Sequence, residues 1–116
     1  MKAAEMPAVQ APPIAVTAEQ WEILAEILRR HAGGRPVWAY GSRARGSRPG
    51  NRIKQYSDLD LIVGGEPFRG LEAWGLEEAF DESRLPFRVE FQHGSELSAE
   101  FRERVEKDFV VVQGRG

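Results

Sequence analysis

The sequence predicts an α/β fold in which helices pack on a small mixed β-sheet. Two observations support this prediction. Segments with apolar residues at helical spacing follow one another along the chain with short apolar or alternating runs between them. Glycine and proline separate most of these segments, as expected where a chain turns from one element into the next. Helices and strands that alternate within a small domain are typical of helices packed on a sheet.

The first helix is expected at about residues 18–31. Thr17 and Gln20 have the spacing of a capping box, which satisfies free backbone N–H groups at the start of a helix. From Trp21 onward, apolar residues recur at helical spacing and form one stripe. Gly33, which a second glycine follows, is expected to end this helix.

The remaining elements are expected to be short. Four segments are expected to be strands because they are apolar or alternate apolar with polar residues: 37–40, 58–63, 87–92 and 109–112. Two more helices are expected at about 68–81 and 97–105. In the first of these helices, Leu71, Trp74 and Phe80 are expected to face the core.

Length and composition fit one small domain. The chain has 116 residues, and its first 15 are rich in alanine and proline, so residues 1–15 are expected to be a flexible segment before a domain at 16–113. A formal net charge of -2 argues against direct nucleic-acid binding, and no apolar run approaches the ~20 residues that span a membrane. Without cysteine, disulfides and thiolate metal sites are excluded. With no apolar signal core at the N-terminus, a cytoplasmic protein is expected.

A candidate phosphate-binding turn follows the first expected strand. Gly41 allows a ligand to approach the backbone closely, and Ser42 offers a hydroxyl where a strand would turn into a helix with free N–H groups. Arg43 and Arg45 flank this turn and are expected to contact the nucleotide too. The basic run that they begin is otherwise more typical of a solvated loop.

Three acidic residues form the second candidate site. Asp58 and Asp60 are separated by one residue in an expected strand, so both side chains point to one face and Leu59 points to the other. Glu90 lies on the polar face of the strand expected at 87–92. If the two strands are neighbours, three carboxylates meet, as a two-metal phosphoryl-transfer site requires. The sequence therefore predicts that the three acids are catalytic and bind Mg²⁺.

Each feature alone has an ordinary structural explanation. A single Asp-x-Asp at a strand start is usually a solvated pair, and a single Gly-Ser after a strand carries less information still. Glu90 by itself would most often be a surface residue. Both motifs at the edges of apolar strands and in this order are much rarer by chance, which favours a site.

Together these residues resemble the motif of the minimal nucleotidyltransferases, a family of the DNA polymerase β-like superfamily. The matching segments are GSRARG at 41–46 and SDLDL at 57–61, and the resemblance covers about residues 17–112. The chain departs from the family in two ways. The third acid is commonly aspartate but is Glu90 here, and the basic loop at 47–56 is a few residues longer than usual.

The resemblance implies a polymerase β-like nucleotidyltransferase fold and a Mg²⁺-dependent enzyme that uses ATP. Gly41 and Ser42 are implied to hold the nucleotide phosphates, and Asp58 and Asp60 to bind Mg²⁺. Glu90 occupies the position of the third acid.

Small members of this family are often antitoxins that are paired with a HEPN-domain ribonuclease toxin and transfer AMP to one of its tyrosines. The resemblance therefore implies a protein adenylyltransferase whose partner is a HEPN-type toxin. One alternative is an inactive nucleotidyltransferase fold that neutralises its partner by binding alone. Another is transfer to a small molecule such as an aminoglycoside, which the absence of an acceptor-binding lobe after the expected sheet disfavours.

Overall fold

The computed structural model describes residues 12–45 and 57–114. Their helices are α1 (Ala18–His31), α2 (Glu72–Asp81) and α3 (Ala99–Val105), and their strands are β1 (Val37–Tyr40), β2 (Leu59–Val63), β3 (Val89–His93) and β4 (Val110–Gln113). Two short 3₁₀ helices, η1 (Gly94–Glu96) and η2 (Glu106–Asp108), flank α3. The predicted α/β class is confirmed. Within the two described ranges, no helix is both long and apolar enough to cross a membrane.

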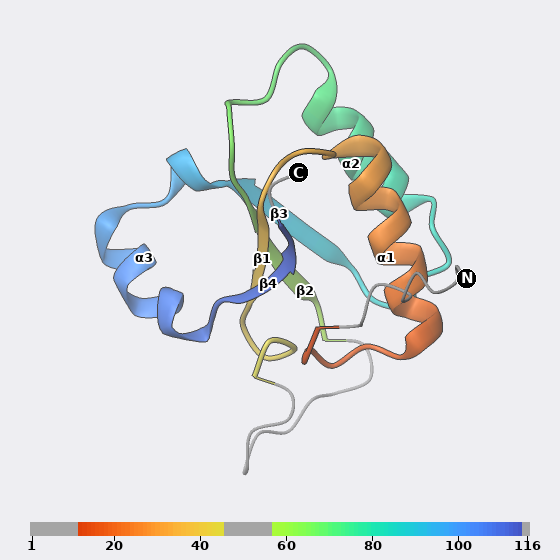
Figure 1. Cartoon of the computed structure of the whole chain (residues 1–116), viewed down its shortest axis with the longest axis horizontal. Helices are drawn as coiled ribbons and strands as arrows, with labels where there is room; N and C mark the ends of the chain where they lie inside the picture. Colours follow the sequence, from red (N-terminus) through yellow and green to blue (C-terminus); the bar gives the residue numbers. More distant parts are fainter. Residues whose placement is uncertain (1–11, 46–56, 115–116) are drawn as a thin grey trace, which may run out of the picture.

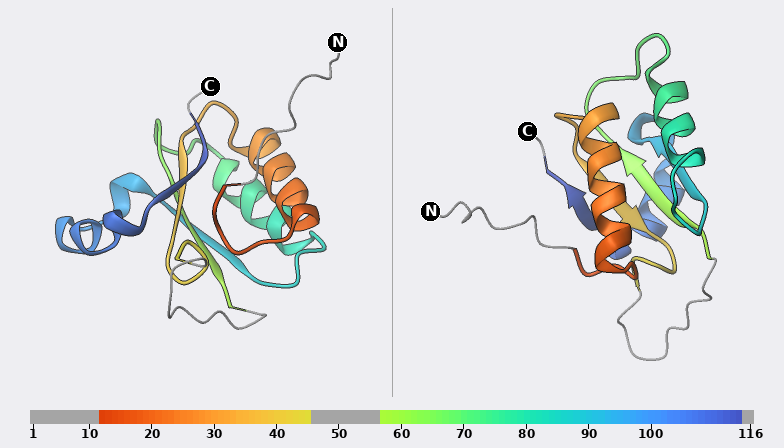
Figure 2. Two further views of the ribbon diagram at one scale, coloured as in Figure 1. Left: turned by 60° about the horizontal axis from the view of Figure 1, so that its bottom comes forward. Right: turned by 90° about the vertical axis from the view of Figure 1, so that its right-hand side faces the viewer.

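The described strands form one mixed sheet with the order β3-β2-β1-β4. β1 is antiparallel to β2 and to β4, whereas β2 and β3 are parallel. α1 and α2 cover one face of the sheet, which we call the two-helix face, and α3 lies on the opposite side, the α3 face (Figures 1 and 2). The sheet is thus the middle layer, and its two faces have different neighbours.

The main core lies between the sheet and α1 with α2. Side-chain alternation directs Leu59, Leu61 and Val63 of β2 to the two-helix face, where all three are fully buried. Leu24 and Leu28 of α1 are fully buried against them. β2, one of the two central strands, is therefore anchored on this face by three of its five side chains.

α1 has the predicted boundaries because its capping box forms. The Thr17 hydroxyl accepts a hydrogen bond from the backbone N–H of Gln20 at 3.1 Å. The Gln20 side chain accepts one from the backbone N–H of Thr17 at 2.9 Å. These local bonds involve only residues three positions apart, which explains why the sequence alone predicts this helix well.

Two predictions about the core are wrong. Leu71 and Trp74 were expected to face inward, but they are 74% and 56% exposed. α2 begins at Glu72, later than predicted, and its buried residues are Leu76 and Phe80. Of the three predicted inward residues, only Phe80 is confirmed. A short helix with a glycine in it has two plausible apolar stripes, and packing on α1 and β3 selects one of them.

Contacts with the core begin within the segment that the composition predicts to be flexible. Ile14 is buried, and the backbone N–H of Ala15 donates to the carbonyl of Arg43 at 2.9 Å. Residues 12–15 therefore pack with the domain, because a loop distant in sequence provides their partner. Residues 1–11 lie outside the described residues.

Aromatic side chains attach α3 and η2 to the sheet. α3 has no buried residue of its own. The rings of Tyr40 and Phe101 meet edge to face with centroids 5.8 Å apart, and Trp38 stacks on Phe109 at 6.0 Å. Such pairs add about 0.5–1.5 kcal/mol each beyond the area they bury. This side of the sheet is therefore held by a few rings, not by a continuous core.

We expect Leu28→Ala to lower the free energy of unfolding by about 2–5 kcal/mol, because the deleted atoms leave a cavity at a fully buried position. Leu71→Ala makes the same chemical change at a residue that is 74% exposed, so it should change the free energy of unfolding by less than about 0.5 kcal/mol. Urea denaturation of the two variants measures both values. Equal losses would contradict this assignment of the core.

Candidate functional site

Asp60 and Glu90 lie side by side on the α3 face. They are register partners in the parallel pair of β2 and β3. Partners in adjacent strands point to the same face, and the flanking Leu59 and Leu61 are buried on the other one. Asp60 is partly buried and Glu90 is exposed. The predicted convergence of these two carboxylates is thus confirmed by the register.

Asp58 borders this pair from the residue before β2 begins. It is exposed, and its charge reaches Asp60. Burial, followed by the nearby charges of Glu90 and Asp58, raises the pKa of Asp60 to about 6. Asp60 therefore lies close enough to Glu90 and to Asp58 to be repelled by both charges, and this repulsion would be relieved by a bound cation.

The three carboxylates are the candidate ligands for a hard cation. Oxygen ligands of this kind suit Mg²⁺. Among residues 12–45 and 57–114, however, no three acidic, histidine or cysteine side chains are placed to hold one ion together. The chemical fit therefore rests on the donor type, on the register of Asp60 with Glu90, and on the charge repulsion between the acids.

Gly41 lies against Asp60. Its φ angle is +86°, a left-handed conformation that favours glycine. A Cβ atom at this position would lie 2.7 Å from Asp60 Oδ2. Glycine is needed here both for its backbone conformation and for space, and the candidate phosphate turn directly adjoins the carboxylates.

Ser42 is partly buried in the turn that follows β1. The backbone N–H of Arg45 donates to the Gly41 carbonyl at 3.1 Å and closes one helical turn. The described residues after β1 thus form a turn, and the helix start expected after the strand stays a prediction. The longer basic loop at 47–56 lies outside the described residues.

Arg43 was expected to contact the nucleotide, but it is buried within the fold. Its Nε donates to the carbonyl of Ser57 at 2.7 Å, and its Nη1 donates to that of Ala15 at 2.6 Å. The guanidinium also lies 4.0 Å from the centroid of the Phe87 ring. Arg43 therefore joins the candidate phosphate turn to the segments that precede α1 and β2. Sequence composition could not reveal this, since basic residues are usually exposed.

Arg45 forms an ion pair with Asp108 of η2, with Nη1 and Oδ2 separated by 3.2 Å. Its side chain is 39% exposed, so part of it stays accessible beside the turn. The nucleotide-binding roles of Arg43 and Arg45 stay predictions.

Three residues near the acids were not assigned to the site from the sequence. Tyr40 is the register partner of Asp60 on β1, and Gln92 Nε2 donates to its hydroxyl at 3.5 Å. Burial raises the pKa of Tyr40, and the charges of Asp60 and Glu90 act in the same direction. Arg88 Nε lies 3.3 Å from Glu90 Oε2. Strand alternation already indicated that Arg88 and Gln92 share the face of Glu90. Only the register of β1 with β2 shows that Tyr40 lies beside Asp60.

Comparison with known proteins gives one clear relationship. No family model matches the sequence. The chain is 40% identical over 99 residues to the probable protein adenylyltransferase MntA of Haemophilus influenzae. The aligned region covers 84% of this chain and 82% of that relative. It is too long and too similar to reflect a shared local motif alone.

Asp60 is expected to contribute less to the stability of the metal-free chain as pH rises from about 4 to about 7. The pKa of Asp60 is about 6 in the folded chain against 3.8 for an ordinary aspartate, so the folded state holds the proton more tightly. The stability from this proton is fully present below pH 3.8 and is lost as pH rises through 6.

Asp60→Asn removes this effect. The free energy of unfolding of the variant minus that of the wild type should be about 1–2 kcal/mol larger at pH 8 than at pH 4, after allowance for solvent screening of a partly buried group. Urea denaturation in EDTA at the two pH values provides the comparison. A difference between variant and wild type that does not change with pH would contradict the raised pKa.

Proposed function

We propose, since this chain belongs to the MntA-like family of nucleotidyltransferases with the polymerase β-like fold, that it transfers AMP from ATP to a protein hydroxyl. The acceptor is a tyrosine of a partner HEPN-type toxin, and the modification makes the chain an antitoxin. One observation carries the proposal: Asp60 and Glu90 are paired in register directly beside the Gly41 turn. This places carboxylates next to the turn that the sequence motif assigns to phosphate.

Asp58, Asp60 and Glu90 would hold Mg²⁺ through their carboxylates. When bound, the metal would link the protein to the triphosphate and neutralise charge that develops during transfer. Burial and, after it, the charges of Glu90 and Asp58 raise the pKa of Asp60, and a bound cation would offset the part that comes from these charges. Arg88 contacts Glu90 only at the surface, where an ion pair is weak and easily exchanged.

The Gly41–Ser42 turn would hold the β- and γ-phosphates. Its backbone N–H groups and the Ser42 hydroxyl are hydrogen-bond donors of the type that bind phosphate. The contact between Gly41 and Asp60 Oδ2 couples this turn to the carboxylates. A side chain at position 41 would displace the Asp60 carboxylate, so glycine serves both parts of the site.

In the proposed reaction, the acceptor oxygen forms a bond to the α-phosphorus of ATP. The bond from that phosphorus to the oxygen that bridges to the β-phosphate breaks, and pyrophosphate leaves. Glu90 accepts the proton of the acceptor hydroxyl, a role that suits an exposed carboxylate at the rim of the site. The products are an AMP-modified hydroxyl and pyrophosphate.

Neutralisation by binding alone is the second candidate function. It is favoured by the absence, within the described ranges, of three acidic, histidine or cysteine side chains gathered around one point. The pairing of Glu90 with Arg88 also leaves the third acid engaged. The two functions differ in whether the partner gains mass.

The transfer itself is tested by intact-mass spectrometry of the partner after incubation with the chain, ATP and Mg²⁺. The wild type should add one AMP, and Asp60→Asn should lower the rate by about 100-fold or more, because the amide keeps the size but loses the charge. Glu90→Gln should slow transfer strongly, whereas Glu90→Asp keeps a carboxylate and should retain substantial activity. Glu103→Gln, an exposed position on α3, is the control. A partner that is silenced without any gain in mass would favour binding alone.

Nucleotide binding is tested separately by calorimetry. The Asp58→Ala, Asp60→Ala double variant should bind MgATP at least about tenfold more weakly, because the triphosphate loses its ion bridge. Its fold should persist, since neither carboxylate belongs to the core. Glu22→Ala on α1 serves as the control and should match the wild type. Unchanged MgATP affinity in the folded double variant would refute the metal assignment.

A further inference from the structure

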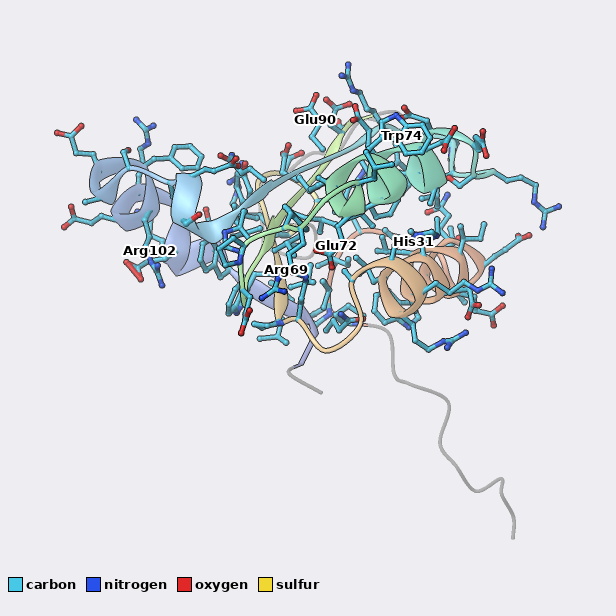
Figure 3. The ribbon with its side chains drawn as sticks, turned by 90° about the horizontal axis from the view of Figure 1, so that it is seen from above. His31, Arg69, Glu72, Trp74, Glu90 and Arg102 are labelled. Carbon is cyan, nitrogen blue, oxygen red and sulfur yellow. The ribbon has the colours of Figure 1, made fainter. Side chains whose placement is uncertain are left out.

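A groove of about 730 Å³ runs along the outer edge of β3, beside α2. α2 contributes four residues at helical spacing: Ala73, Trp74, Glu77 and Asp81. The opposite wall is the whole of β3, including Glu90. Trp74 and Glu90 lie on the same side of the molecule in Figure 3. The groove therefore reaches the carboxylate that the candidate site uses.

β3 has an open edge along this groove. It is the last strand in the sheet order, and among the described residues no strand pairs with its outer side. The backbone N–H of Leu59 donates to the carbonyl of Arg88 at 2.9 Å, which sets the alternation of the parallel ladder. Val89 and Phe91 consequently direct their backbone N–H and C=O groups away from β2. An edge of this kind can accept an additional strand.

The charge of the groove is predominantly negative. Its walls carry four carboxylates, those of Glu77, Asp81, Glu90 and Glu96. The single arginine of the lining, Arg88, is already paired with Glu90 at 3.3 Å. A segment that lies in this groove is therefore favoured if it is basic.

We propose that this groove, which we call the β3 groove, binds an extended basic segment of the acceptor protein as an additional strand on β3. The inference rests on the proposed function and identifies where its protein substrate docks. Strand addition supplies backbone hydrogen bonds, and alternate side chains supply specificity. The acids beside the strand select lysine and arginine in the segment.

Side-chain alternation explains how such a strand would present its hydroxyl. Every second residue of the added strand points to the α3 face, where Glu90 and its register partner Asp60 lie. The residues between them point to the two-helix face, where α2 presents Glu77, Asp81 and the half-exposed ring of Trp74. The geometry thus brings a tyrosine opposite Glu90 while its basic neighbours face the acids of α2.

The test uses a synthetic peptide of about nine residues, long enough for one strand, that alternates valine with lysine or arginine and carries tyrosine in place of the central valine, so that the basic residues face α2. In NMR hydrogen exchange, saturating peptide should protect the amides of Val89 and Phe91. A matched peptide with glutamate at every basic position should bind at least tenfold more weakly. Equal binding of the two peptides, or bound peptide without protection of these amides, would overturn the proposal.

A double charge reversal tests the acidic wall. Glu77→Lys with Asp81→Lys should weaken peptide binding at least tenfold and raise the KM for the protein acceptor by a similar factor. Glu22→Lys with Glu103→Lys changes the net charge equally at exposed positions on α1 and α3 and should stay within twofold of the wild type. Unchanged binding in the groove variant would refute the role of these acids.

The outcomes separate this inference from the proposed function. If the groove variant adds AMP to its acceptor with the KM of the wild type, the β3 groove is not the docking site, while the transferase function stands. If the peptide binds and protects both amides but the acceptor never gains AMP, the groove stands and the transferase function fails. Protection that appears without peptide as the chain becomes more concentrated would show that a second copy occupies the edge, against the proposal.

Discussion

The parallel register of β2 and β3 is the constraint on which the candidate site depends. It makes Asp60 and Glu90 partners on the α3 face. A slip of one residue would send Glu90 to the two-helix face and expose the apolar residues beside it. Burial of Val89 and the packing of Phe91 against the core oppose that slip, because both side chains would lose these contacts. Hydrophobic packing on the two-helix face therefore positions the Asp60 and Glu90 carboxylates on the α3 face.

Two buried arginines hold the ends of the strand that carries Asp60. At its start, Arg43 donates to the carbonyl of Ser57 at 2.7 Å. Just beyond its end, Arg35 donates to the carbonyl of Gly64 at 3.0 Å. A guanidinium has five N–H donors in a rigid plane, so it can satisfy several loop carbonyls at once. These arginines position the strand, although the motif places one of them beside the nucleotide.

The neighbouring carboxylates of the site destabilise the fold electrostatically, and packing elsewhere offsets this cost. Like charges directly opposite each other on adjacent strands are unfavourable, and burial makes them more so. Burial raises the pKa of Asp60, and the charges of Glu90 and Asp58 raise it further. The exposed pairing of Arg88 with Glu90 relieves only part of this repulsion. Unfavourable electrostatics of this kind are expected at functional positions, where charged groups are placed for chemistry although they destabilise the fold. They also explain why Asp60 is expected to contribute less to the stability of the metal-free chain as it ionises.

The sequence by itself determined what local interactions control: the class of fold, the boundaries of α1 with its Thr17 cap, and the alternation that turns Asp60 away from the buried Leu59 and Leu61. Capping and strand alternation act within a few residues, so they can be predicted without knowledge of packing. Only the tertiary structure decided that Asp60 and Glu90 are register partners, that Arg43 is buried and that Trp74 is exposed. These outcomes depend on contacts between residues distant in the chain, where the gain from burying one surface decides which face of each neighbouring element turns inward.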